Sequence, residues 1–281
     1  MTVDADEDEA RAAQRAHWAG RAAAWNRTTD EGVNQADPYN ARLMDAAGVK
    51  AGQTVVDLAS GAGEPALTMA SRVGARGIVF ATDLVPEMLG GARQRAVQAR
   101  LANVRYVIAD MQDLPYRDAA FDALTCRFGF MFPDDSLAAA SAARRILKPG
   151  CRAAFLVWGP LEENVLFDIT RHAIHQFLGL DLDETPGKRH RYAEAGSVVE
   201  VLRAAGFSEV TETDLDDDNE MPADTRFWRA RLERSYAKEM AALTAEARQR
   251  LEASVVEALE PYRDGALYRL RTFARLCVGT A

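Results

Sequence analysis

An acid and two glycines stand close together in residues 55–66, which read VVDLASGAGEPA. Asp57 follows an apolar run and is expected to close a buried parallel strand. Gly61 and Gly63 lack the Cβ atoms that would keep a ligand away from the backbone, and Pro65 suits the first turn of a following helix. The free amides of such a turn face a bound ligand. The segment therefore predicts a strand-turn-helix that binds a cofactor.

The glycine spacing alone leaves more than one ligand open, because GAGEPA also satisfies the loose dinucleotide pattern G-x-G-x-x-G/A. In nicotinamide-binding chains the acid usually comes only at the end of the next strand. Here acids occupy both places, Asp57 and Asp83. The acid four residues before Gly61 therefore weighs against a nicotinamide cofactor. A structural turn without a ligand is the remaining alternative.

Strands and helices alternate in the middle of the chain, as is typical of a parallel sheet with helices on both faces. The expected strands are residues 54–58, 77–82, 104–109, 123–128, 152–158, 208–213 and 267–278. The expected helices are residues 64–73, 86–100, 135–147 and 197–205. The third helix is expected to stop at KPG, a helix-ending signal just before a strand. This order predicts an α/β domain.

Helical segments surround the expected sheet. We expect a domain of residues 51–281, preceded by an N-terminal helical lid of residues 1–50 and carrying lid insertions at about 159–194 and 221–265. The N-terminal helix carries an apolar stripe at i, i+4 and i+7, formed by Trp18, Ala22 and Trp25. Plain scaffold packing is the alternative for any single aromatic residue in these segments.

Composition favours an ordinary soluble protein of the cytoplasm. The chain has 281 residues, of which 48% are hydrophobic and 27% charged. No apolar run approaches the roughly 18 residues of a membrane span, and the acidic start MTVDADEDEA lacks the pattern of a secretory signal. Cys126, Cys151 and Cys277 show no C-x-x-C pairing and fit reduced core thiols. We therefore expect no stable membrane insertion.

Charge weighs against nucleic acid as a partner. The 34 basic and 42 acidic side chains give a formal charge of -8, which repels a phosphate backbone. The basic run KRHR at residues 188–191 is short and is expected to be a solvated turn. The expected partner is a small molecule, and a homodimer is left open.

Four pieces of the chain carry a family resemblance. They are VVDLASGAGEPAL, VFATDLVPEML, NVRYVIADMQDLPYRDAAFDALTCRFGF and RRILKPGCRAAFLVW, in that order within residues 54–156. Together they resemble a class I S-adenosylmethionine-dependent methyltransferase, and most of all the group of ubiquinone and menaquinone biosynthesis C-methyltransferases. The resemblance implies a Rossmann-like, mostly parallel seven-stranded sheet whose last strand is inserted antiparallel. It also implies S-adenosylmethionine as the cofactor.

The residue types fit that cofactor, which needs carboxylates, free amides and an apolar slot. Asp57 is expected to meet the amino group or to hold the glycine loop, Asp83 to accept the ribose hydroxyls, and Asp110 to accept the adenine amino group. Further expected contacts are the amides near Ala59, Gly61, Gly63 and Met111, the side chains of Leu84 and Met88 beside the adenine, and Arg127 at the methionine end or the substrate.

Methyl transfer from a sulfonium is an in-line displacement, in which alignment can supply roughly 7 to 11 kcal/mol. A general base is optional, because an amine needs only to be neutral whereas a phenol or activated carbon benefits from proton removal. His172 and His175 share one face of an expected helix and are the candidate catalytic bases, followed by His190 and Tyr192. Without a nearby carboxylate or thiol partner, they predict no metal site.

The methyl acceptor is less clearly indicated. The tetrapeptide [DNS]-P-P-[YFW], which marks methyltransferases that act on base amino groups, is absent, and its place reads CRFGFMFP. Aromatic residues predict a largely apolar small-molecule pocket; these are Trp158, Phe167, Phe177, Phe227 and Trp228. A natural product, a quinone, a sterol-like lipid and an aromatic amine all fit. A C-, O- or N-acceptor therefore remains open.

Two other classes of function are weighed against methyl transfer. A nicotinamide-dependent oxidoreductase would share the first half of the fold and the acid at Asp83. Asp57, LPYRDAAFD and ILKPG disfavour it. A non-catalytic S-adenosylmethionine-binding protein would keep the cofactor residues, and the sequence leaves that alternative open.

Overall fold

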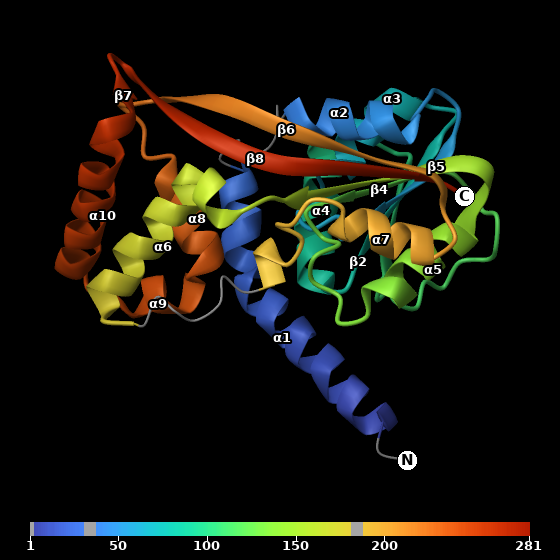
Figure 1. Ribbon diagram of the computed structural model, residues 1–281, viewed down its shortest axis with the longest axis horizontal. Coiled ribbons are helices and arrows are strands. Elements are labelled where there is room, and N and C mark those ends of the chain that lie inside the picture. Colours follow the sequence, from blue (N-terminus) through green and yellow to red (C-terminus); the bar gives the residue numbers. More distant parts are fainter. Residues whose placement is uncertain (1–2, 31–37, 181–187) are drawn as a thin grey trace. The chain divides into compact units, whose positions relative to one another are not determined.

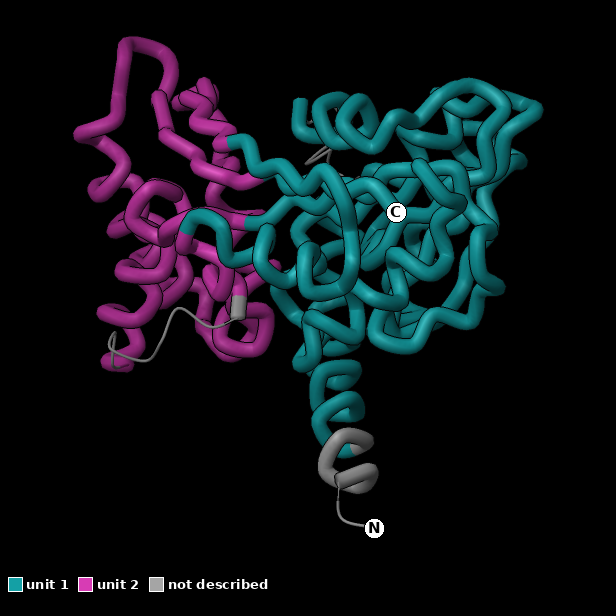
Figure 2. The backbone as a smooth tube through the Cα atoms, turned by 45° about the vertical axis from the view of Figure 1, so that its right-hand side comes forward, with its two compact units in different colours: residues 1–157, 195–213, 276–281 teal, residues 158–194, 214–275 magenta. Residues whose placement is uncertain are grey.

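The computed structural model describes residues 3–30, 38–180 and 188–281, and Figure 1 shows their helices and strands. The chain forms two compact units, coloured separately in Figure 2. The first unit contains residues 1–157, 195–213 and 276–281. The second unit contains residues 158–194 and 214–275, so two separate stretches of the chain build it. The expected lid role of these stretches stays a prediction.

One sheet runs in the strand order β3-β2-β1-β4-β5-β8-β6, and the short β7 pairs with β8. The strands are β1 Thr54–Leu58, β2 Ile78–Asp83, β3 Val104–Ile108, β4 Phe121–Arg127, β5 Leu147–Trp158, β6 Ser208–Pro222, β7 Arg263–Asp264 and β8 Leu267–Thr280. Strands β1 to β5 pair in parallel. Backbone bonds from Gly150 to Ala281 and from Gly159 to Phe273 run β8 antiparallel to β5. The predicted α/β fold with an antiparallel last strand is confirmed.

Helices of the first unit lie on both sides of this sheet (Figure 1). They are α1 Val3–Asp30, α2 Pro38–Ala47, α3 Ala66–Val73, α4 Pro86–Gln98, α5 Ser136–Ile146 and α7 Ser197–Ala204. The central strands β1 and β4 are apolar runs buried on both faces, as is typical of parallel sheets. Local signals set the helix starts: Pro86 occupies the first turn of α4, and the Asp135 side chain accepts from the Ala138 amide at 2.8 Å to cap α5.

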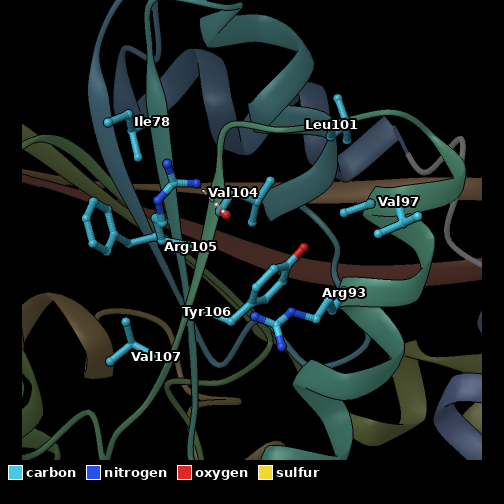
Figure 3. A pocket seen from close by; sticks show the side chains of 10 residues that line it. Ile78, Arg93, Val97, Leu101, Val104, Arg105, Tyr106 and Val107 are labelled. Atoms are coloured by element: carbon cyan, nitrogen blue, oxygen red, sulfur yellow. Dashed lines mark hydrogen bonds between the residues drawn. The ribbon is translucent and has the colours of Figure 1, made fainter.

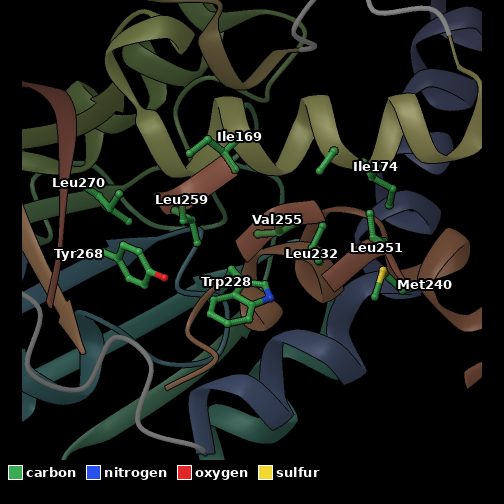
Figure 4. Packing of buried hydrophobic residues seen from close by; sticks show 11 residues of the cluster. Ile169, Ile174, Trp228, Leu232, Met240, Leu251, Val255, Leu259, Tyr268 and Leu270 are labelled. Carbon is green, nitrogen blue, oxygen red and sulfur yellow. The ribbon is translucent and has the colours of Figure 1, made fainter. Parts of the chain in front are cut away.

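The second unit has a helical core of its own, shown in Figure 4. Its helices are α6 Val165–Leu178, α8 Trp228–Ser235, α9 Ala237–Ala242 and α10 Ala245–Leu259, with 3-10 turns η1 Leu161–Glu163, η2 Lys188–His190 and η3 Glu260–Tyr262. Buried side chains of α6, α8 and α10 pack together, and Trp228 is one of them. Phe177 and Phe227 pack against this core. For these three aromatic residues, scaffold packing is therefore observed where a substrate pocket was expected.

Two strands differ in extent from the sequence prediction. β6 continues to Pro222 although it was expected to end near residue 213. Cross-strand ion pairs with β8 offset the low strand propensity of its acidic residues; Arg271, for example, donates to both carboxylate oxygens of Asp216 at 2.8 Å. β5 begins at Leu147, so KPG lies inside the strand, where Gly150 takes a φ of +77°. Helix α5 ends at Ile146, as predicted, but β5 follows it directly without a separate turn.

Candidate functional site

Three carboxylates follow the first three strands of the sheet. Asp57 is the next-to-last residue of β1, Asp83 is the final residue of β2, and Asp110 comes just after β3. Because these strands are parallel, their carboxyl ends meet at one edge of the sheet. Arg127 ends β4, which pairs with β1. The structure thus brings the predicted residues to one edge, and their contacts with a cofactor stay a prediction.

The Asp57 side chain is fully buried, and this burial raises its pKa to about 7. Thr125 on β4 donates a hydrogen bond of 2.6 Å to Oδ1, which together with the charge of Arg127 opposes that shift. The other oxygen, Oδ2, is buried and has no hydrogen-bond partner among the described residues. A buried carboxylate oxygen without a partner costs free energy. It therefore fits the cationic group of a ligand.

Asp83 ties the glycine loop to the end of β2. The Gly61 amide donates to its Oδ2 at 2.8 Å, and the Val85 amide donates to its Oδ1 at 2.9 Å. Burial raises the pKa of Asp83 to about 6, and the hydrogen bonds from the backbone amides oppose the shift. Each carboxylate oxygen can accept more than one hydrogen bond. Binding of ribose hydroxyls by the same carboxylate is thus compatible with the observed bonds.

Gly61 and Gly63 of the loop differ in what surrounds them. Gly61 has a φ of +52°, and a Cβ built on it would meet only open space and the Ala59 carbonyl oxygen at 3.9 Å. Gly63 has a φ of +119°, and its Cβ would lie 2.9 Å from Cδ1 of Leu67 and 3.2 Å from Cβ of Ala92. Gly63 therefore lets α3 and α4 pack closely, whereas Gly61 leaves room for a ligand.

The residues expected beside an adenine lie under the N-terminal helix. Met88 is buried, and Leu84 packs against it. The rest of this apolar cluster consists of Val85 and of Trp18, Ala19, Ala22 and Trp25 from α1. Asp110 pairs with Arg11 of α1, whose Nε lies 3.4 Å from Oδ2, and accepts from the Gln112 amide at 2.9 Å. The predicted stripe of α1 thus packs on the predicted cofactor edge, and half-buried Met111 follows Asp110.

Sequence reasoning missed three residues that hold this site in shape. Ser60 donates to the Asp57 carbonyl at 2.9 Å and accepts from the Thr82 amide at 3.0 Å. Thr125 stands opposite Asp57 in the register of β1 and β4, so it could be found only once that register was known. A Cβ on Gly129 would lie 2.4 Å from Cβ of Ala59. That glycine is therefore needed for packing behind the loop.

A fourth missed residue is Arg95 on α4, a buried arginine. Its Nε and Nη2 donate to the carbonyl oxygen of Ala62 in the glycine loop at 2.8 and 2.6 Å. Its Nη2 also donates to Oδ1 of Asn26 on α1 at 2.8 Å. One guanidinium therefore connects the loop with the N-terminal helix. Sequence offers a weak signal for this role, because nothing in it distinguishes Arg95 from Arg93, the other arginine of α4.

The candidate bases belong to the second unit. His172 is 53% exposed, and its Nδ1 lies 3.0 Å from a carboxylate oxygen of Asp168, as in a surface i, i+4 pair. The ring of His175 lies 6.0 Å from that of Tyr236. His190 donates from Nδ1 to the Gly159 carbonyl at 2.7 Å, and burial lowers its pKa to about 4. A catalytic role for any of them stays a prediction.

A surface hollow of about 580 Å³ lies between α4 and the edge strand β3 (Figure 3). Arg93 and Val97 of α4 and Tyr106 of β3 line it, and the Arg93 guanidinium lies 5.6 Å from the Tyr106 ring centroid. None of the predicted site residues lines this hollow.

In residues 3–30, 38–180 and 188–281, no three His, Cys, Asp or Glu side chains are grouped to hold a metal. No helix in these ranges has the length and apolarity to cross a membrane.

Cys126, Cys151 and Cys277 are not joined in disulfides. Cys126 and Cys277 are buried, as expected for core thiols, whereas Cys151 is only partly buried. Its position near the start of β5, where the strand is exposed, explains the difference.

The inserted antiparallel strand β8, with acids in the last residues of β1 and β2 and just after β3, is the arrangement of a class I methyltransferase fold. The ubiE/COQ5 methyltransferase family matches residues 32–170. The demethylmenaquinone methyltransferase of Thermus thermophilus is 35% identical over 181 residues, which cover 60% of this chain and 81% of that protein. The chain therefore belongs to the ubiE/COQ5 methyltransferase family.

Other relatives match a shorter region. The ubiquinone/menaquinone biosynthesis C-methyltransferase UbiE of Cellvibrio japonicus is 34% identical over 48% of this chain and 56% of the relative. The 2-phytyl-1,4-naphtoquinone methyltransferase of Trichormus variabilis is 39% identical over 39% of this chain and 48% of the relative. The chain thus spans about half the length of these two relatives.

Solved structures share the fold at low identity. A Bacillus halodurans protein is 24% identical, with a TM-score of 0.57 over 86% of this chain and 97% of that chain. A phosphoethanolamine N-methyltransferase of Haemonchus contortus is 19% identical, with a TM-score of 0.54 over 86% of this chain and 52% of that chain. The [4+2]-cyclase SpnF is also 19% identical, with a TM-score of 0.52 over 86% of this chain and 80% of that chain. The fold alone therefore does not name the reaction.

Proposed function

We propose that this protein transfers a methyl group from S-adenosylmethionine to a small, largely apolar or aromatic molecule. The observation that carries the proposal is the unpartnered Oδ2 of Asp57, buried beside a glycine loop with open space at Gly61. A ligand with a primary ammonium group supplies the partner that this oxygen lacks. Membership of the ubiE/COQ5 methyltransferase family supports the same cofactor.

Each part of the cofactor has a candidate partner at the sheet edge. Asp57 would hold the ammonium group, Asp83 the ribose hydroxyls, and Asp110 the adenine amino group, with Leu84 and Met88 forming the apolar slot. When bound, S-adenosylmethionine supplies an electrophilic methyl group on a sulfonium. The task of the protein is then to align the acceptor and to exclude water. We propose that α1, which packs on Met88 and pairs with Asp110, covers the adenine end.

For the acceptor we propose an aromatic or quinone-type ring that is methylated on carbon. The support is that relatives with 34% to 39% identity are named for methylation of quinones and their precursors. Methylation of a carbon or phenol acceptor is helped when a base removes a proton from it. We therefore keep His172 and His175 as candidate bases. His190 is a third candidate, because its low pKa keeps it neutral near pH 7 and its Nδ1 donation leaves Nε2 as the acceptor.

Calorimetric titration of the full chain with S-adenosylmethionine, S-adenosylhomocysteine and NAD tests the proposal. We expect micromolar binding of the first two and none of NAD. A methyl-transfer screen over quinols, phenols, aromatic amines and sterol-like lipids then identifies the acceptor. Binding of S-adenosylmethionine with no transfer to any acceptor class would favour the non-catalytic alternative. Binding of NAD alone would favour the oxidoreductase.

A further inference from the structure

Phe167 of α6 is surrounded by cationic and aromatic side chains, all of which belong to the second unit. The Arg231 guanidinium carbon lies 3.7 Å from the ring centroid, and that of Arg189 lies 5.5 Å away. The Trp158 ring meets Phe167 edge-on at 4.7 Å, and the His190 ring lies 6.0 Å away. The basic run at residues 188–191 is therefore partly packed on aromatic rings and is not the solvated turn that the sequence suggested.

Arg231 has no acidic partner in the described part of the chain, unlike Arg229 and Arg248 of the same unit. Its Nε is buried and makes no hydrogen bond. Arg229 of the same helix also has a buried Nε without a hydrogen bond, but it pairs with Glu252 at 2.6 Å, and Arg248 pairs with Glu233 at 3.5 Å. This difference matters because an exposed arginine can rely on water, whereas a partly buried guanidinium whose Nε is closed off from solvent needs acceptors to replace its hydration.

The charges near Arg231 increase that cost. Burial is the largest influence and holds the pKa of Arg231 well below its usual value, and the cations Arg189 and Arg234 act in the same direction. Tyr236, a neutral phenol near pH 7, is the group that opposes them. The same two arginines, Arg189 and Arg231, help to lower the pKa of His190. The charged side chains that lower the pKa of Arg231 are thus both arginines.

We propose that Arg231, assisted by the charge of Arg189, binds the carboxylate or phosphate group of a small-molecule ligand. A guanidinium presents parallel N–H donors that match such an oxyanion. Phe167 and Trp158 supply an apolar, aromatic wall beside the charge, which favours a ligand whose anionic group is attached to a ring. This site goes beyond the proposed methyl transfer: His190, a candidate base, lies beside Phe167, but anion binding by Arg231 is measured without S-adenosylmethionine and so is tested separately.

The proposal can be tested by calorimetry and thermal unfolding of the full chain with sodium benzoate and with inorganic phosphate, against sodium chloride at equal ionic strength. The variants are Arg231→Met and a matched control, Arg250→Met. Arg250 is exposed, belongs to the same unit and lies 5.9 Å from the Phe177 ring centroid. We expect benzoate or phosphate to bind the wild type and Arg250→Met alike. Arg231→Met should bind the same anion at least tenfold more weakly.

Stability without an anion gives a second readout. Replacing a partly buried cation that has no acidic partner by an apolar side chain of similar length, which can still pack on Phe167, is expected to be neutral or stabilising, so the melting temperature of Arg231→Met should equal or exceed that of the wild type. A lower melting temperature would show that Arg231 is structural and would overturn the proposal. Arg231→Gln, which keeps a polar side chain, repeats the binding test should Arg231→Met fail to fold.

The two anions separate the ligand classes. Benzoate binding without phosphate binding indicates a carboxylate on a ring, and binding of both indicates a general oxyanion site. Binding of neither anion to the wild type, or equal binding by Arg231→Met and Arg250→Met, would contradict the proposal. A parallel titration with S-adenosylmethionine keeps the outcomes distinct, because its failure counts against the methyltransferase proposal alone.

Discussion

The two units hold their charged side chains in different ways. In the first unit, the carboxylates of Asp57 and Asp83 lie at strand ends and take hydrogen bonds from a hydroxyl and from backbone amides. In the second unit, most of the described arginines pair with acids, and Arg231 does not. Charged residues at strand ends can be located from the sequence, because the strands themselves can be predicted. Charged residues placed by the packing of helices cannot be located in this way.

The largest effect is expected at Asp83. Asp83→Ala removes the acceptor for the Gly61 and Val85 amides, and hydrogen bonds to a charged group contribute about 1.5 to 3 kcal/mol each. S-adenosylmethionine should bind tenfold or more weakly, as measured by calorimetry, while the circular dichroism spectrum stays unchanged. Asp113→Ala is the control, because Asp113 is exposed in the loop after β3. Unchanged affinity in Asp83→Ala would remove Asp83 from the site.

A smaller effect is expected at Arg95, which couples the glycine loop to α1. Arg95→Met leaves the Ala62 carbonyl and Asn26 without their donor, at a cost of about 1 to 3 kcal/mol in the free energy of unfolding. Arg93→Met is the matched control, since Arg93 is exposed on the same helix and stacks on Tyr106. Urea unfolding measures both variants. Equal stability of the two would show that the Arg95 contacts do not hold the loop.

The buried carboxylate of Asp57 should make the stability of the protein depend on pH. The folded pKa of Asp57, about 7, lies above its unfolded value of 3.8, so the folded state binds an extra proton between these values. The free energy of unfolding should therefore fall as pH rises through this window, by up to about 1.4 kcal/mol per pH unit for this group. Asp57→Asn should reduce that slope. Asp83 adds a similar contribution up to about pH 6. If the free energy of unfolding of Asp57→Asn depended on pH as steeply as that of the wild type, the raised pKa of Asp57 would be contradicted.

The smallest effect is expected in the ion pairs between β6 and β8. Arg271 donates to both oxygens of Asp216 at 2.8 Å, but both side chains are more than two-fifths exposed. Exposed pairs contribute about 0 to 1 kcal/mol. A double-mutant cycle with Arg271→Ala and Asp216→Ala should give a coupling energy in that range, decreasing with added salt. A coupling energy well above this range would show that the pair contributes more than its exposure allows.

The sequence predicted the sheet and the cofactor edge well for a specific reason. Each of Asp57, Asp83 and Asp110 follows a short apolar run, and the parallel arrangement brings such ends together. The length of β6 was not predictable, because acidic residues disfavour strands until Arg271 and its neighbours pair with them.

The residues that support the site were harder to find from sequence. Arg95 and Thr125 act through contacts between elements far apart in the chain, which periodicity does not reveal. The same holds in the second unit, where Trp228 lies in the core that Figure 4 shows and not in a substrate pocket. The unpaired state of Arg231 likewise depends on how α6 and α8 pack.

The most direct test is the affinity for S-adenosylmethionine at pH 6 and pH 8, in the wild type and in Asp57→Asn. A carboxylate with a pKa of about 7 is mostly ionised at pH 8 and mostly neutral at pH 6. The wild type should therefore bind in the micromolar range at pH 8 and more weakly at pH 6, whereas Asp57→Asn should bind weakly at both. No binding by the wild type at either pH would contradict the assignment of the glycine loop and of the function that rests on it.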